Sequence, residues 1–80
     1  MTEQQRKAYD LLMCNNNIDE DDRKVFKTTM EFIESGHTNF DSRELGEYYK
    51  SQGLPLPSME QFQRVYMLVN LVMQMKFVKN

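Results

Sequence analysis

The chain has very little cysteine and histidine, with one residue of each among its 80 residues. The single thiol, Cys14, cannot form an intrachain disulfide, and this usage fits a reducing, intracellular setting. Cys14 and His37 are too few for a zinc site, and a Cys–His nucleophile pair would need an orienting third group and a pocket. We therefore expect no metal ion, no cofactor and no small-molecule substrate, and we expect that the protein is not an enzyme.

The chain also lacks an apolar run long enough to cross a bilayer, which takes about 20 residues. Its most apolar segment, residues 65–78, is interrupted by Asn70, Gln74 and Lys76. The first ten residues, MTEQQRKAYD, have no apolar centre of the secretory-signal type. We therefore expect a cytoplasmic protein that makes no contact with a membrane.

A basic excess is missing as well, because ten Lys and Arg residues oppose twelve Asp and Glu residues and the net charge is −2. Binding to nucleic acid depends on neutralising phosphates, and this total does not favour it. The acidic run at residues 19–22 could form a docking face with Glu31 and Glu34. More often such a run is solvated and supports a helix N-terminus, where negative charge is favourable.

The same acidic region superficially resembles a calcium-binding loop, since Asn15, Asn17, Asp19 and Asp21 alternate with other residues. A calcium loop needs Gly at its sixth position and Glu at its twelfth. Here those positions hold Glu20 and Phe26. Helix capping is therefore the better account of these side chains, and no metal site is predicted.

Apolar residues repeat at helical spacing in four segments, which predicts one all-α domain over residues 1–80, a compact four-helix domain. The expected helices lie within residues 2–14, 19–36, 41–53 and 58–78. Their inner faces are expected at Ala8, Leu11 and Leu12; at Val25, Phe26, Met30 and Ile33; at Leu45, Tyr48 and Tyr49; and at Phe62, Val65, Val69 and Val72. Caps are predicted at Thr2, Asp41 and Ser58, and glycine ends at Gly36 and Gly53.

The segment Val65–Val78 is the most unusual part of the chain, because eleven of its fourteen residues are apolar. A surface helix needs only one apolar stripe roughly 100° wide. The surplus has two explanations that the sequence does not separate. Met67, Leu71 and Met73 either complete the core of a central helix or form a Met-rich surface that adapts to a partner.

Residues 23–78 resemble the winged-helix or helix-turn-helix superfamily. The matching pieces are a long helix at 22–35, an extended Thr38-Asn39-Phe40, the segment Ser42-Arg43-Glu44-Leu45-Gly46, and a last helix that ends in Met75-Lys76-Phe77-Val78. The resemblance implies a helix-turn-helix-like arrangement of the last three helices, with a short C-terminal strand or extended tail. The turn at 51–57 is longer and richer in proline than is usual. The chain stops two residues after Val78, so the wing is not completed.

The resemblance also implies an alternative function as a DNA-binding transcriptional regulator, dimeric in that case. Gln61, Gln63 and Arg64 would enter the major groove, where Gln and Arg read base edges. Arg43 and Lys50 would contact phosphates. A basic stripe is the usual footprint of a duplex binder, and Glu44, Glu47 and Glu60 interrupt this one.

The favoured expectation is a small non-enzymatic regulator or inhibitor that acts by binding another protein. A phage or other mobile element that encodes the protein, with a host factor as its target, suits the small size, the acidity and the lack of catalytic groups. A homodimer is a further expectation. The predicted contact surface adds the acidic start of the second helix to five residues, Tyr48, Phe62, Tyr66, Met67 and Met73.

Overall fold

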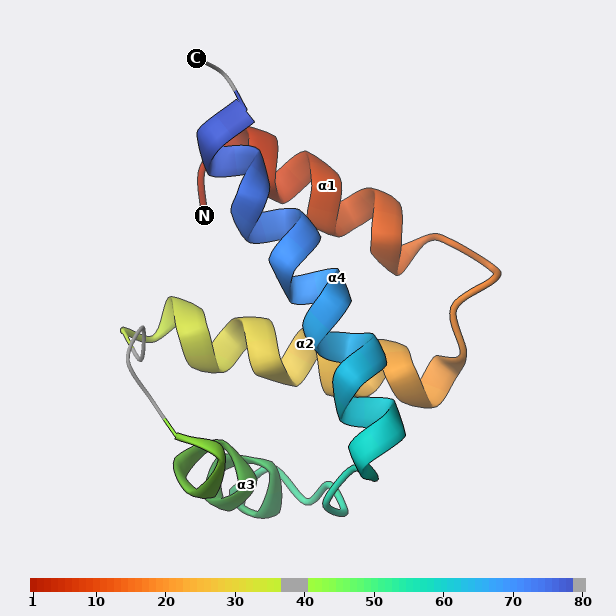
Figure 1. Ribbon diagram of the computed structural model, residues 1–80, viewed down its shortest axis with the longest axis vertical. Helices are drawn as coiled ribbons and strands as arrows, with labels where there is room; N and C mark the ends of the chain where they lie inside the picture. Colours follow the sequence, from red (N-terminus) through yellow and green to blue (C-terminus); the bar gives the residue numbers. More distant parts are fainter. Residues whose placement is uncertain (37–40, 79–80) are drawn as a thin grey trace.

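A computed structural model describes residues 1–36 and 41–78, and the side chains in these ranges other than those of Ser42 and residues 74–78. The described chain forms four helices and no strand (Figure 1): α1 Glu3–Met13, α2 Glu20–Glu34, α3 Ser42–Ser51 and α4 Met59–Val78. The predicted all-α, four-helix architecture is confirmed. The expected C-terminal strand or tail would follow α4, and residues 79 and 80 lie outside the described residues.

The helices begin and end where the sequence places their caps. Thr2 Oγ1 accepts a hydrogen bond from the Gln5 backbone N–H at 3.1 Å, and the Gln5 side chain accepts one from the Thr2 N–H at 2.9 Å. The side chains of Asp41 and Ser58 each accept the N–H of the residue three positions further on. Gly36 follows α2 with a φ of +105°, which residues with a Cβ rarely adopt.

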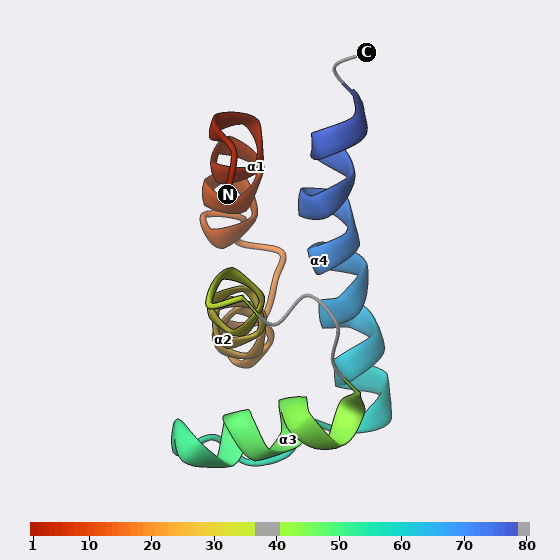
Figure 2. The same ribbon diagram turned by 90° about the vertical axis from the view of Figure 1, so that its left-hand side faces the viewer.

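The helices are arranged around α4. In Figure 1, α1 lies alongside the C-terminal half of α4, and α2 crosses its middle. Figure 2 shows that α1 and α2 both lie on one side of α4, while α3 lies across the end from which α4 begins. On the opposite side of α4, Figure 2 shows no other described helix or loop.

The core is formed mainly by α2 and α4, with two residues from α3. Its buried apolar residues are Val25, Phe26, Met30, Phe32, Ile33, Leu45, Tyr49, Val65, Val69 and Val72. The inner faces predicted for α2 and α4 are therefore confirmed, apart from Phe62, which is only half-buried. Half-buried side chains of α1 pack against this core, among them Tyr9, whose ring centroid lies 5.3 Å from that of Phe26.

The inner face of α1 differs from the prediction. Leu11 was expected to face inward with Ala8 and Leu12, but its side chain is 75% exposed, so this expectation is wrong. Gln5 is buried instead, since its side chain closes the N-terminal cap. With Gln5 and Leu12 on the inner side, the 100° step per residue turns Leu11 toward solvent.

One buried polar contact joins α2 to α3. Thr29 Oγ1 donates to the Val25 carbonyl at 2.7 Å and lies 2.5 Å from the Tyr49 hydroxyl. Because the Thr29 proton is used in α2, Tyr49 is the donor to Thr29. Burial raises the pKa of Tyr49, although the hydrogen bond to Thr29 acts in the opposite direction. The phenol therefore stays neutral, and its hydrogen bond fixes α3 against α2.

Candidate functional site

Unlike an ordinary amphipathic helix, α4 has large apolar residues on its exposed side as well as on its buried side. Val65, Val69 and Val72 face the core and are at most 2% exposed. Large apolar side chains also lie on the solvent side, where the exposed fractions are 73% for Met59, 46% for Tyr66, 67% for Met67 and 52% for Leu71. The surplus of apolar residues in this segment is therefore only partly core.

We call the exposed residues Met59, Gln63, Tyr66, Met67, Asn70 and Leu71 the outer face of α4. The structure shows which of the residues in question belong to the core. Met67 and Leu71 lie on the outer face, whereas Met73 is half-buried and packs against the core. Among the described side chains of α4 only Glu60 and Arg64 are charged, and the six residues of the outer face are all neutral.

Three of the five predicted partner-binding residues lie together on α4. The rings of Phe62 and Tyr66 stack, with centroids 5.8 Å apart and planes inclined by 24°, and Met67 follows on the outer face. Tyr48 lies elsewhere. It is half-buried against Phe32 of α2, at a centroid distance of 4.9 Å.

Sequence reasoning missed two neighbours of this cluster, Leu56 and Met59. Leu56 is 57% exposed and Met59 more so, and both line an apolar pocket of about 170 Å³ beside Phe62. The other lining residues are Leu45, Gly46, Tyr49 and Pro57. The only available signal was Leu56 itself, an apolar residue between two prolines. Prolines keep this linker extended, which leads Leu56 back over α3.

The residues assigned to DNA contact are divided by an ion-pair cluster at the junction of α2 and α4. The Asp22 carboxylate is buried and accepts hydrogen bonds from Gln61 Nε2 at 3.0 Å and from Arg64 Nε at 2.9 Å. Two of the three predicted base-reading side chains, Gln61 and Arg64, are thus bound to Asp22. The third, Gln63, and the two residues predicted to contact phosphates, Arg43 and Lys50, are exposed.

The burial of Asp22 also corrects part of the expectation for the acidic run. Glu20 and Asp21 are exposed in the first turn of α2, as expected of a solvated helix start. The expectation is wrong for Asp22, because the guanidinium of Arg64 lies against its carboxylate. Hydrogen bonding from Arg64 lowers the pKa of Asp22, with a smaller contribution from Gln61, and outweighs the opposing effect of burial.

The pairing of Asp22 predicts a specific loss of stability in acid. The folded pKa lies below the ordinary value of 3.8, so this contribution is complete above that value and is lost as the pH falls through the folded pKa. We expect Asp22→Asn to remove it. The difference in unfolding free energy between wild type and variant, measured by urea denaturation, should shrink between about pH 5 and pH 2. A constant difference across that range would contradict this role.

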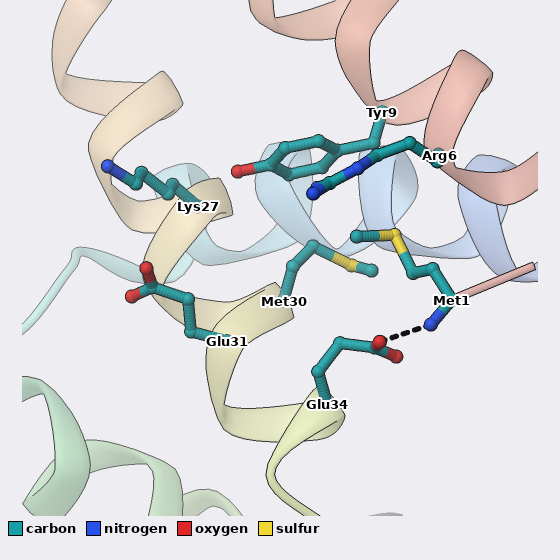
Figure 3. Close-up of a pocket in the computed structure, with 7 residues that line it drawn as sticks. All are labelled: Met1, Arg6, Tyr9, Lys27, Met30, Glu31 and Glu34. Carbon is teal, nitrogen blue, oxygen red and sulfur yellow. Dashed lines mark hydrogen bonds and ion pairs between the residues drawn. The ribbon is translucent and has the colours of Figure 1, made fainter. Parts of the chain in front are cut away.

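A larger pocket, of about 500 Å³, lies between α1 and α2 (Figure 3). Its lining residues are Met1, Arg6, Tyr9, Lys27, Met30, Glu31 and Glu34. Figure 3 shows the Lys27 amine and the Tyr9 hydroxyl at one end, and the ion pair between the Met1 ammonium and Glu34 at the other. Burial and the nearby Glu31 raise the pKa of Tyr9, so its phenol is not a base at neutral pH. Three positive groups, those of Met1, Arg6 and Lys27, face the two carboxylates of Glu31 and Glu34. None of these lining residues forms a nucleophile–base pair.

The described residues contain neither a metal-binding cluster nor a helix that could span a membrane. No group of three or more His, Cys, Asp or Glu side chains within them is arranged to hold a metal ion. None of the four described helices combines the length and hydropathy that a membrane span requires. Comparisons with protein-family models, with curated proteins and with solved structures give no match.

Proposed function

We propose that the protein is a small cytoplasmic regulator or inhibitor, without catalytic activity, that acts by binding another protein through the outer face of α4. The observation that carries this proposal is the exposure of Met59, Tyr66, Met67 and Leu71 on a side of α4 that no other described helix covers. Within the proposal, a phage or other mobile element encodes the protein and a host factor is its target.

The chemistry of this surface suits a protein partner. Contiguous apolar patches of several hundred Å² are uncommon on monomers and often mark interaction sites. The unbranched thioethers of Met59 and Met67 adapt to an irregular partner surface. Tyr66 offers a ring for apolar contact and a hydroxyl that can remain hydrated at the rim. The pocket beside Phe62 extends the surface and could receive one apolar side chain of the partner.

The acidic start of α2 adjoins this surface, because Asp22 binds Arg64 in the second turn of α4. Glu20 and Asp21 are exposed there and leave a negative edge beside an apolar face. Electrostatic complementarity mainly accelerates association and selects partners. The proposed target therefore presents an apolar patch with basic residues at one border.

Affinity capture from the natural host tests this function. The wild-type chain should retain a defined protein, and Met67→Glu should lose it, because a carboxylate replaces an exposed apolar contact. Leu11→Glu is the matched control: it places the same charge on an exposed leucine of α1 and should retain the protein as wild type does. Retention of no protein, or equal retention by Met67→Glu, would contradict the proposal.

Duplex DNA is the alternative ligand, and the same preparations separate the two functions. A duplex binder should shift DNA with a steep dependence on salt concentration, and Arg43→Ala or Lys50→Ala should weaken the shift uniformly. The proposed function predicts no shift of any duplex at low salt. A salt-dependent shift that Met67→Glu leaves unchanged would favour the DNA-binding alternative.

A further inference from the structure

The outer face of α4 contains a stripe whose chemistry is the same in both directions. Gln63, Tyr66, Met67 and Asn70 follow the spacing i, i+3, i+4, i+7, which places them on one side of the helix, and all four are exposed. The order is amide, apolar, apolar, amide, and reversing the helix leaves it unchanged. We propose that a second copy of this chain binds this stripe as an antiparallel α4–α4 pair.

The two-fold axis of this pair passes between Tyr66 and Met67. In a two-fold contact the same patch serves both chains, so the patch has to complement itself. Reversal brings Gln63 opposite Asn70 of the second copy, and the two side-chain amides can hydrogen-bond at each end of the stripe. It also brings Tyr66 opposite Met67 of the second copy, where a thioether meets an aromatic ring. The apolar side chains of the two copies are thus buried against each other, and each side-chain amide hydrogen-bonds with an amide of the other copy.

Charge favours the antiparallel direction over the parallel one. Glu60 is exposed at the border of the stripe, one turn before Gln63. In a parallel pair the two Glu60 carboxylates would lie side by side and repel each other. In the antiparallel pair they lie about 20 Å apart along the axis at 1.5 Å per residue, which is beyond the screening length of about 8 Å in physiological salt.

The contact is small. From Met59 to Leu71 the outer face is about 18 Å long, which places a helix pair of this length among the interfaces of less than about 1,200 Å² in total. Interfaces of this class are weak, so we expect a dimer that dissociates in the micromolar range. The inference does not depend on the partner proposed above, although both would contact Tyr66 and Met67.

Sedimentation of the full chain tests the pair, at concentrations from about 10 µM to about 1 mM. Wild type should shift from monomer to dimer, whereas Tyr66→Glu and Met67→Lys should each remain monomeric. An equal mixture of these two variants should dimerise again, because the antiparallel arrangement places the new glutamate opposite the new lysine. Leu11→Glu should associate as wild type does, and circular dichroism should show all variants to be helical.

The inference is overturned by a wild-type chain that stays monomeric throughout, by a Met67→Lys variant that still dimerises, or by a mixture that stays monomeric. These results are independent of the proposed function. A dimer that retains no host protein would support the pair and contradict the regulator. A monomer that retains a host protein through Met67 would contradict the pair and support the regulator.

Discussion

Phe26→Ala is expected to lower the free energy of unfolding by about 3–5 kcal/mol, the usual cost of removing a buried aromatic ring. Phe26 has no exposed surface and its ring contacts Tyr9, so the cavity would lie where α1, α2 and α4 meet. A domain of this size has a total stability of roughly 4–12 kcal/mol. The variant should therefore be largely unfolded at urea concentrations well below the denaturation midpoint of wild type.

Urea denaturation followed by circular dichroism measures this effect. Leu11→Ala is the control, because it also truncates an apolar side chain, but one that is 75% exposed. It should change the unfolding free energy by no more than about 0.5 kcal/mol. A loss below about 1 kcal/mol for Phe26→Ala would show that the core is not built on this face of α2.

Val69→Asp is expected to unfold the protein, whereas Met67→Asp should leave its stability nearly unchanged. Val69 is 2% exposed and Met67 is 67% exposed, although only one residue separates them in α4. An unpaired carboxylate in the core costs at least about 4 kcal/mol, which approaches the stability of the whole domain. On the outer face the same carboxylate remains in water.

Thermal denaturation of the two variants and wild type, followed by circular dichroism, measures this contrast. Wild type and Met67→Asp should melt cooperatively at similar temperatures, and Val69→Asp should show no cooperative transition. Equal destabilisation of both variants would mean that Met67 is also part of the core. The outer face of α4 would then not be available for binding.

The helix boundaries and most of the core follow from local signals in the sequence. Thr2 with Gln5, and Asp41 with the backbone of Glu44, are capping patterns whose geometry depends on neighbours within one turn. The inner face of α2 is strictly periodic and has no competing apolar side. Such features are predictable because the interactions that determine them lie within one helix.

Features that depend on contacts between distant segments were not predictable in the same way. Asp22 looks like one member of a solvated acidic run, and its burial is made favourable by Gln61 and Arg64, which lie 39 and 42 residues further along the chain. Leu11 also looks like a core residue, but α1 packs against the core through Ala8, Tyr9 and Leu12 and leaves Leu11 exposed. In both cases contacts with other helices decide between two orientations that the sequence leaves equal.

The candidate site lies between these two cases. The sequence shows that residues 65–78 carry more apolar residues than one helix face needs, and it predicts a contact role for Phe62, Tyr66 and Met67. It does not show which side of α4 the other helices leave uncovered. That depends on α1 and α2 packing on the same side of α4.

Oxidation of individual methionines is the most direct measurement of whether the outer face of α4 binds protein. In the isolated chain at low concentration, mass spectrometry should find fast oxidation by peroxide at Met59 and Met67, and slow oxidation at Met30, which is 1% exposed. When the retained host protein is bound, oxidation of Met67 should slow markedly while Met30 remains unchanged. Oxidation of Met67 at the same rate with and without the bound protein would contradict the account.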